Sequence, residues 1–176
     1  MEYYVTREGL KKLYNEIGMQ DAIHDELEKE MGKSVKRDND LRENPEYMQL
    51  RVKAMYGIPQ EKRNLVLKYN NAVIIEETPE YINWNGETVI RKCDIKIDYN
   101  GEIEEYSILG SNEGNLLEGI LSCESPLVKA LLGKKVGETI LFNNEPVTVL
   151  LVEKSKYDVH SEKELQKVKK IEEHNW

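Results

Sequence analysis

Two long helix-patterned segments are separated by the ten residues DNDLRENPEY, which run from Asp38 to Tyr47. Two carboxylates of this stretch, Asp40 and Glu43, lie midway between the segments. If the segments pair as antiparallel helices, the acidic stretch becomes the turn at the far end of a two-helix arm. A helix rises ~1.5 Å per residue, so about 30 residues give an arm roughly 45 Å long. On the residues alone, a solvated charged turn is the favoured reading, because exposed charges are common at turns.

The segment before the turn has the pattern of a long amphipathic helix. Thr6 is suited to cap its first turn, in which Glu8 faces the positive end of the helix dipole. Apolar residues then recur mostly at steps of three and four, at Leu10, Leu13, Ile17, Ile23, Leu27, Met31 and Val35. The pattern predicts a helix to about Val35, and its narrow apolar stripe favours a coiled-coil arm.

The second helix is predicted to begin directly after the acidic pair. Asn44 is a good N-cap, and Pro45 suits the first helical position, where a missing N–H costs nothing. Gly57 and Pro59 interrupt the apolar pattern that follows. An internal proline removes a backbone hydrogen bond, so we expect a kink or short break there, with the helix resuming to about Lys68.

After the arm, the pattern changes to short strands. We predict strands at 72–75, 88–97, 103–109, 140–142 and 147–152, with hairpin turns at Tyr99-Asn100-Gly101 and at Asn143–Pro146. One helix interrupts them, capped by Ser125, opened by Pro126 and ended by Gly133. The fold class is therefore α+β, with a small, mostly antiparallel sheet and one packed helix. Four apolar residues are candidates for the core or for the neighbourhood of a docking surface, and the sequence leaves both roles open: Leu116, Leu117, Ile120 and Leu121.

We divide the chain into an arm (residues 1–75), a globular domain (76–154) and a charged extension (155–176). In the extension, Ser161 and Glu164 have the spacing of a capping box and predict a short helix.

Composition excludes several classes of function. The 176 residues carry a net charge of −8, and the charges of residues 1–75 balance, so the acidic excess lies in the second part. A protein that binds polyanions with its whole surface needs an excess of positive charge, so any nucleic-acid contact is expected to be local. Cys93 and Cys123 are expected to be buried free thiols, which suits a reducing cytoplasm. We expect no signal peptide and no membrane span.

Two motifs resemble the bacterial Gre transcript-cleavage factors. The tip of that family reads roughly G-D-L-x-E-N-A-E-Y, and residues 39–47 read N-D-L-R-E-N-P-E-Y. The family's second signature is S-P-[LI]-x-x-A-L-[LI]-G-K-x-x-G-[DE], and residues 125–138 read S-P-L-V-K-A-L-L-G-K-K-V-G-E. The similarity covers roughly residues 4–154. Asn39 and Pro45 depart from the family's glycine and alanine, Gly57 and Pro59 look unusual, and the acidic pair is retained.

The resemblance implies a mechanism and a partner. A Gre factor inserts its arm into the secondary channel of bacterial RNA polymerase, where its tip carboxylates complete a site for the polymerase's second Mg²⁺. Asp40 would coordinate the ion directly, and Glu43 would position the ion or its water. The 3′ end of backtracked RNA would then be cleaved by the polymerase, so the factor itself is not an enzyme.

The resemblance also implies roles for residues around the tip. Lys33, Lys36 and Arg37 are candidates for contact with RNA, with ordinary solvated charge as an equal alternative. Arg42 and Asn44 are candidates for contact with the polymerase, although solvated charge and helix capping already explain them. The globular domain is expected to be FKBP-like without isomerase activity and to dock on the polymerase, and the protein is expected to be a cytoplasmic monomer.

Two other functions remain open from the sequence. A Gre-like inhibitor would occupy the channel without promoting cleavage, and retention of both acidic residues argues against it. An FKBP-like binding module with a coiled-coil arm would not need the tip motif.

Overall fold

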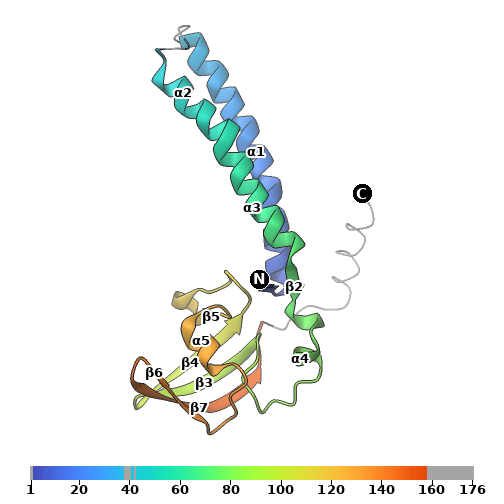
Figure 1. The fold of residues 1–176 in the computed structure, drawn as a ribbon, viewed down its shortest axis with the longest axis vertical. Helices are drawn as coiled ribbons and strands as arrows, with labels where there is room; N and C mark the ends of the chain where they lie inside the picture. The colour runs from blue at the N-terminus through green and yellow to red at the C-terminus, as the bar shows by residue number, and fades with distance from the viewer. Residues whose placement is uncertain (1, 38–40, 42, 158–176) are drawn as a thin grey trace. The chain divides into compact units, whose positions relative to one another are not determined.

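The chain forms two compact units, Met1–Thr78 and a second one from Pro79 onward, in a computed structural model that describes residues 2–37, 41 and 43–157. The first is a helical arm closed at its base by two short strands, and the second is built on a five-stranded sheet (Figure 1). This arrangement confirms the predicted α+β class. The extension helix predicted around Ser161 and Glu164 lies outside the described residues.

The arm is a pair of antiparallel helical segments that lie side by side (Figure 1). The first is α1 (Arg7–Arg37), and the second comprises α2 (Pro45–Val52), η1 (Lys53–Gly57) and α3 (Ile58–Asn70). Thr6 Oγ1 accepts a hydrogen bond from the Gly9 amide at 3.0 Å, which confirms Thr6 as the cap. Because both predicted helices form, the turn between them lies at the free end of the arm.

Of the kink or short break expected at Gly57 and Pro59, the break is wrong, because the backbone stays helical through both residues. Lys53–Gly57 forms a π-helical turn, in which the Ile58 amide donates to the Lys53 carbonyl five residues earlier. Gly57 itself has ordinary helical angles, with φ −63° and ψ −62°. In a regular α-helix the ring of Pro59 would crowd the carbonyl of Met55, four residues before it. The wider turn directly before the proline relieves that crowding, so the helix continues without a gap.

The two helices of the arm pack through a small apolar cluster. Leu27 of α1 packs with Ala54 and Ile58 of the second helix, and all three are buried. Ile23, Met31 and Leu50 extend the cluster. Lys62 Nζ also lies 2.6 Å from Asp21 Oδ1 across the pair. These contacts fix the rotation of each helix about its axis.

The base of the arm is closed by pairing that the sequence did not predict. β1 (Tyr3–Val5) pairs in parallel with β2 (Ala72–Ile74), and a 3-10 turn (η2, Ile75–Glu77) follows. The Glu76 carboxylate accepts the amide of Arg7 at 3.1 Å, at the positive end of α1. The segment that precedes α1 and the segment that follows α3 are thereby joined at the base of the arm.

The second unit contains a sheet with the strand order β5-β4-β3-β7-β6. Its strands are β3 (Cys93–Tyr99), β4 (Glu102–Leu109), β5 (Ile120–Ser122), β6 (Thr139–Phe142) and β7 (Glu145–Lys154). All neighbours are antiparallel except β4 and β5, which confirms a mostly antiparallel sheet. The helix α5 (Pro126–Leu131) begins where Ser125 Oγ accepts the Val128 amide at 3.3 Å, as predicted. Two short helical turns, α4 (Pro79–Ile82) and η3 (Leu116–Glu118), were not predicted.

Two sequence predictions about this unit are wrong in part. The strand expected from Thr88 begins only at Cys93, because Thr88 makes a single bridge to Lys135 instead. Of the four core candidates, Ile120 and Leu121 are buried, but Leu116 and Leu117 are 74% and 99% exposed. The 3-10 turn that carries these two leucines ends at Gly119, whose φ of +69° reverses the chain so that only the following strand enters the core.

Both thiols are buried and free, as predicted. Burial raises the pKa of the Cys93 thiol to about 12, and its Sγ donates to the Ile90 carbonyl at 3.0 Å. Within the described part of the chain, no helix is long and apolar enough to cross a membrane.

Candidate functional site at the tip of the arm

The structure places one of the two candidate metal ligands. Glu43 is exposed in the turn between the helices, directly before the buried Asn44. Asp40 and the candidate partner residue Arg42 lie outside the described residues. The described part of the site consists of Glu43 and the residues that hold the two helix ends together beneath it.

Asn44 joins the end of the first helix to the start of the second. Its Oδ1 accepts the Tyr47 amide at 2.9 Å, as expected of an N-cap, and its Nδ2 donates to the Ser34 carbonyl at 3.3 Å. The hydroxyl of Ser34 lies 3.0 Å from Nδ2 and 3.2 Å from Oδ1. We call Ser34 and Asn44 the tip clasp. Asn44 is only 4% exposed, so in this structure its side chain is occupied by the clasp, and its contact with a partner stays a prediction.

Sequence reasoning missed Ser34, although a signal was present. Ser34 follows Leu27 and Met31 at steps of four and three, so it lies on the apolar stripe of α1. A polar residue at such a position is buried at a cost unless a hydrogen-bonding partner meets it there. The structure supplies that partner in Asn44.

The three basic candidates lie on the last turns of α1 and are exposed. They are not equivalent, because Arg37 Nη2 lies 2.9 Å from Glu46 Oε1 of the second helix. This exposed ion pair bridges the helices beside the clasp and adds a small stabilisation. Lys33 and Lys36 remain the better candidates for contact with phosphate, since no ion pair of theirs is seen among the described residues.

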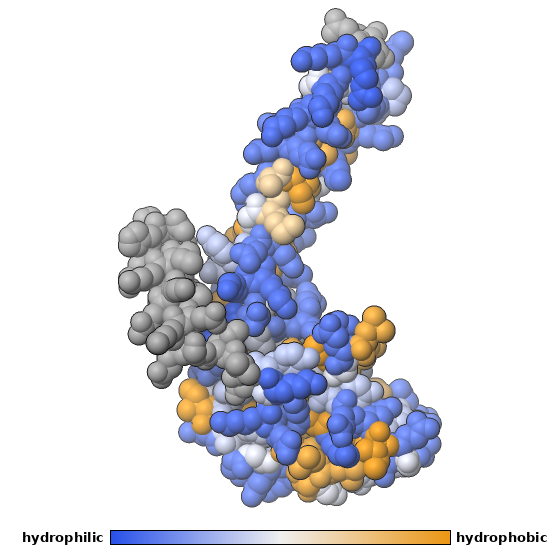
Figure 2. Space-filling view, turned by 180° about the vertical axis from the view of Figure 1, so that it is seen from behind, coloured by the Kyte–Doolittle hydropathy of each residue, from blue (hydrophilic) through white to orange (hydrophobic). Residues whose placement is uncertain are grey.

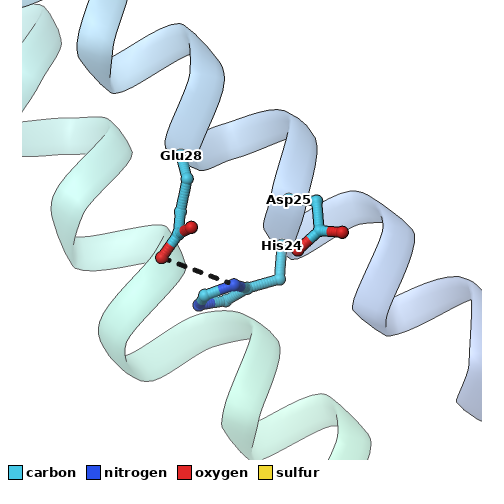
Figure 3. A group of neighbouring side chains, drawn as sticks. All are labelled: His24, Asp25 and Glu28. Carbon is cyan, nitrogen blue, oxygen red and sulfur yellow. Dashed lines mark ion pairs between the residues drawn. The ribbon is translucent and has the colours of Figure 1, made fainter.

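A second group of possible ligands lies lower on the arm. His24, Asp25 and Glu28 each offer one ligand atom within 4.8 Å of the others, and His24 Nδ1 is 3.9 Å from Glu28 Oε1 (Figure 3). All three come from one stretch of α1, and both carboxylates are exposed to solvent. An exposed i, i+4 pair of this kind is a common feature of helix surfaces. Nine residues separate Glu28 from the end of α1, which is about 14 Å of helix, so this group is not part of the tip.

Known proteins resemble the chain over most of its length. Residues 85–161 match the family described as "Transcription elongation factor, GreA/GreB, C-term". The transcription elongation factor GreA of Caldanaerobacter subterraneus subsp. tengcongensis is 37% identical over 139 residues, which are 77% of this chain and 85% of that protein. GreA of Macrococcus caseolyticus is 34% identical over 156 residues, which are 86% and 96% of the two chains. A crystal structure of GreA factor homolog 1 (Gfh1) from Thermus thermophilus covers 87% of this chain and 99% of its own at 20% identity, with a TM-score of only 0.37.

The fold described above is that of a protein with a helical arm and a β unit. The chain belongs to the GreA/GreB family of transcription elongation factors.

Proposed function

We propose that this protein stimulates cleavage of the 3′ end of backtracked RNA by bacterial RNA polymerase, with its arm inside the secondary channel of the enzyme. One observation carries the proposal: Glu43 is exposed at the free end of an arm whose first helix alone has 31 residues, roughly 45 Å. Membership of the Gre family and the tip sequence N-D-L-R-E-N-P-E-Y support it.

The tip carboxylates suit a magnesium ion. Mg²⁺ prefers hard oxygen ligands and is often held by one or two carboxylates together with other groups. Glu43 offers such a carboxylate to solvent, and Asp40 would add a second from three residues earlier in the sequence. Asp40 and Glu43 would hold such an ion jointly with the polymerase, and the ion would supply the Lewis-acid chemistry of two-metal hydrolysis.

The chain's own residues would act by binding and orienting. Asp40 would give an oxygen ligand, and Glu43 would orient the ion or its water. Lys33 and Lys36 would contact phosphates of the extruded RNA, which is a sequence-independent interaction. The protein would therefore complete the active site of another protein and perform no catalysis alone.

The second unit would hold the factor on the polymerase. Leu116 and Leu117 project from the surface of this unit, and exposed apolar groups of this kind mark surfaces that bind other proteins. Figure 2 shows further apolar side chains at the surface of the same unit. We assign the leucine pair to docking outside the channel, so that affinity and cleavage depend on different parts of the molecule.

The test is a transcript-cleavage assay. The full chain is added to a stalled, backtracked complex of a bacterial RNA polymerase with 3′-labelled RNA, in buffer with Mg²⁺, and short 3′ fragments are measured. Faster release of fragments than from polymerase alone supports the proposal. Binding to the polymerase that slows synthesis and releases no fragments would instead indicate an inhibitor of the channel.

A further inference from the structure

We propose that Ser34 is a positioning residue for the acidic tip: through Asn44 it fixes the chain that carries Glu43. It would thereby set the rate of cleavage without touching the metal or the RNA. This inference rests on the proposed function for its activity measurement, and on the geometry of the tip clasp for everything else.

The clasp joins two helix ends through one side chain. The last four carbonyls of a helix and its first four amides have no partner within the helix. The Ser34 carbonyl is among the last four of α1, and Asn44 Nδ2 donates to it. The Tyr47 amide is among the first of α2, and Asn44 Oδ1 accepts from it. Asn44 thus gives a hydrogen-bonding partner to one backbone group of each helix. The Ser34 hydroxyl, 3.0 Å from Asn44 Nδ2, helps to hold the Asn44 side chain in that position.

The clasp is dry, which makes it sensitive to loss of one partner. Ser34 is 0% and Asn44 4% exposed. Without the hydroxyl, the Asn44 side chain keeps the Ser34 carbonyl as an acceptor but loses its contacts of 3.0 and 3.2 Å with the hydroxyl. These contacts lie at a place that water does not reach, where loss of a hydrogen bond is costly. The free energy of the chain around Asn44 then falls if it moves toward solvent, because water can hydrogen-bond to the Asn44 side chain there. Glu43 is the next residue, so it moves as well.

A purely structural serine would behave differently. If Ser34 only filled space between the helices, alanine would be tolerated or would stabilise α1, because alanine is the better helix former. If Ser34 positions the tip, alanine instead lowers the cleavage rate, since a displacement of about 1 Å in a reacting group can cost up to about 100-fold in rate. The two roles therefore predict opposite results for one substitution.

The experiment compares three variants of the full chain. Ser34→Ala removes the hydroxyl. Asn44→Asp keeps the acceptor for the Tyr47 amide and for the Ser34 hydroxyl, but it removes the Nδ2 donor to the Ser34 carbonyl. Ile58→Val trims a buried side chain in the apolar cluster of the arm and controls for a small loss of stability away from the tip. The measurements are hydrogen exchange of the Tyr47 amide in the free protein, the maximal cleavage rate, and the factor concentration that gives half of that rate.

We expect Ser34→Ala to speed exchange of the Tyr47 amide by about threefold or more, as local opening becomes easier. It should lower the maximal cleavage rate by about tenfold while changing the half-maximal concentration less than about twofold. Asn44→Asp should lower the rate similarly with the Tyr47 amide still protected, and Ile58→Val should change neither measurement at the tip.

Failure of this inference is distinguishable from failure of the proposed function. If the unmodified protein releases no fragments, the proposed function fails, and exchange at Tyr47 alone decides whether Ser34 positions the chain. Unchanged exchange in Ser34→Ala overturns the inference in either case. A wild-type cleavage rate in Ser34→Ala also overturns it, because the tie to the Ser34 hydroxyl would then be unnecessary.

Discussion

Glu43 and Asp40 carry the chemistry proposed for this protein, so single substitutions there should affect cleavage and little else. Asp40→Ala and Glu43→Ala should each reduce stimulated cleavage by at least about tenfold, because loss of groups that hold or orient a metal ion costs roughly 10–100-fold in activity. Glu43 is exposed, so the free energy of unfolding should change by less than about 0.5 kcal/mol.

The control for this pair of variants is Glu43→Gln, which keeps the size of the side chain and removes its charge. It should be as defective in cleavage as Glu43→Ala while still binding the polymerase. Wild-type cleavage in both alanine variants would remove the acidic residues from the mechanism.

Cys93 gives a prediction about pH. Burial raises the pKa of its thiol from 9.0 to about 12 in the folded protein. The neutral thiol is therefore favoured by folding, and its contribution is fully present below the unfolded pKa and is lost as pH rises from about 9 toward 12. Chemical denaturation at pH 8 and pH 10.5 should show lower stability at the higher pH, and Cys93→Ala should show a smaller decrease. An equal decrease in both proteins would mean that other groups account for it.

The residues of the tip also show how far sequence reasoning reaches. The capping role of Asn44 and the helix start at Pro45 follow from local chemistry, and the structure confirms both. The bond from Asn44 to Ser34 spans ten residues and depends on how the helices meet, so only its weak trace, a serine on an apolar stripe, was visible in advance.

At the scale of elements, the last turns of α1 should supply the contact with RNA. Replacing Lys33 and Lys36 by alanine should weaken crosslinking of the factor to the RNA 3′ end and raise the factor concentration needed for cleavage. Each lost phosphate contact should reduce the slope of log affinity against log salt by about 0.7. The maximal rate should change less, because the carboxylates are untouched.

Arg37→Ala is the comparison for the lysine pair. Since Arg37 already pairs with Glu46, its loss should cost about 0–1 kcal/mol of arm stability and affect crosslinking less than loss of the two lysines. If the lysine pair changes neither crosslinking nor its salt dependence, these residues are only solvated charge.

The π turn gives a prediction about the arm itself. A β-carbon at Gly57 would meet only Lys53 Cγ at 3.6 Å, an ordinary contact. Gly57→Ala should therefore raise the free energy of unfolding by roughly 0.5–1 kcal/mol, because alanine favours the helix. Adding Pro59→Ala restores a backbone donor and should preserve cleavage, since the packing of Ala54 and Ile58 still fixes the helix.

Thermal unfolding and cleavage of the double variant test this account. A loss of cleavage with folding and polymerase affinity unchanged would show that the turn acts as a hinge. The sequence correctly located the departure from regular α-helix near Gly57 and Pro59, but it did not predict its form. Either a break in the helix or a π turn can relieve the steric conflict that an internal proline causes. Ala54 within the π turn and Ile58 after it both pack against Leu27, a contact between distant residues that the local pattern does not contain.

Across the whole molecule, affinity and chemistry should separate between the two units. Replacing Leu116 and Leu117 together by serine should leave stability nearly unchanged, because both are exposed. It should raise the factor concentration for half-maximal cleavage by about tenfold or more, since burying one leucine at an interface is worth ~1.5–3 kcal/mol. The maximal rate should be retained at saturating factor, in contrast to the tip variants. An unchanged concentration dependence would assign docking to another surface.

The two units also differ in how well the sequence predicted them. The helices of the arm follow from periodicity and caps, and most strands of the second unit follow from turn residues such as Asn143 and Asn144, both of which have positive φ. The parallel pairs β1–β2 and β4–β5 were missed. The strand at 72–75 was predicted, but β1 and β5 have only three residues each and too little pattern to be recognised, so neither pairing could be seen.

The π turn has a consequence for comparing relatives. An i→i+5 ring holds one residue more than an α-helical ring, so Lys53–Gly57 stores one surplus residue inside a continuous helix. A homologue that lacks one residue here can keep both the same buried face and nearly the same length by closing the ring to the α form. In an alignment, a single gap between positions 53 and 57 should therefore not be taken as a shorter arm, whereas a gap within α1 would shift every later residue by about 100° around the axis.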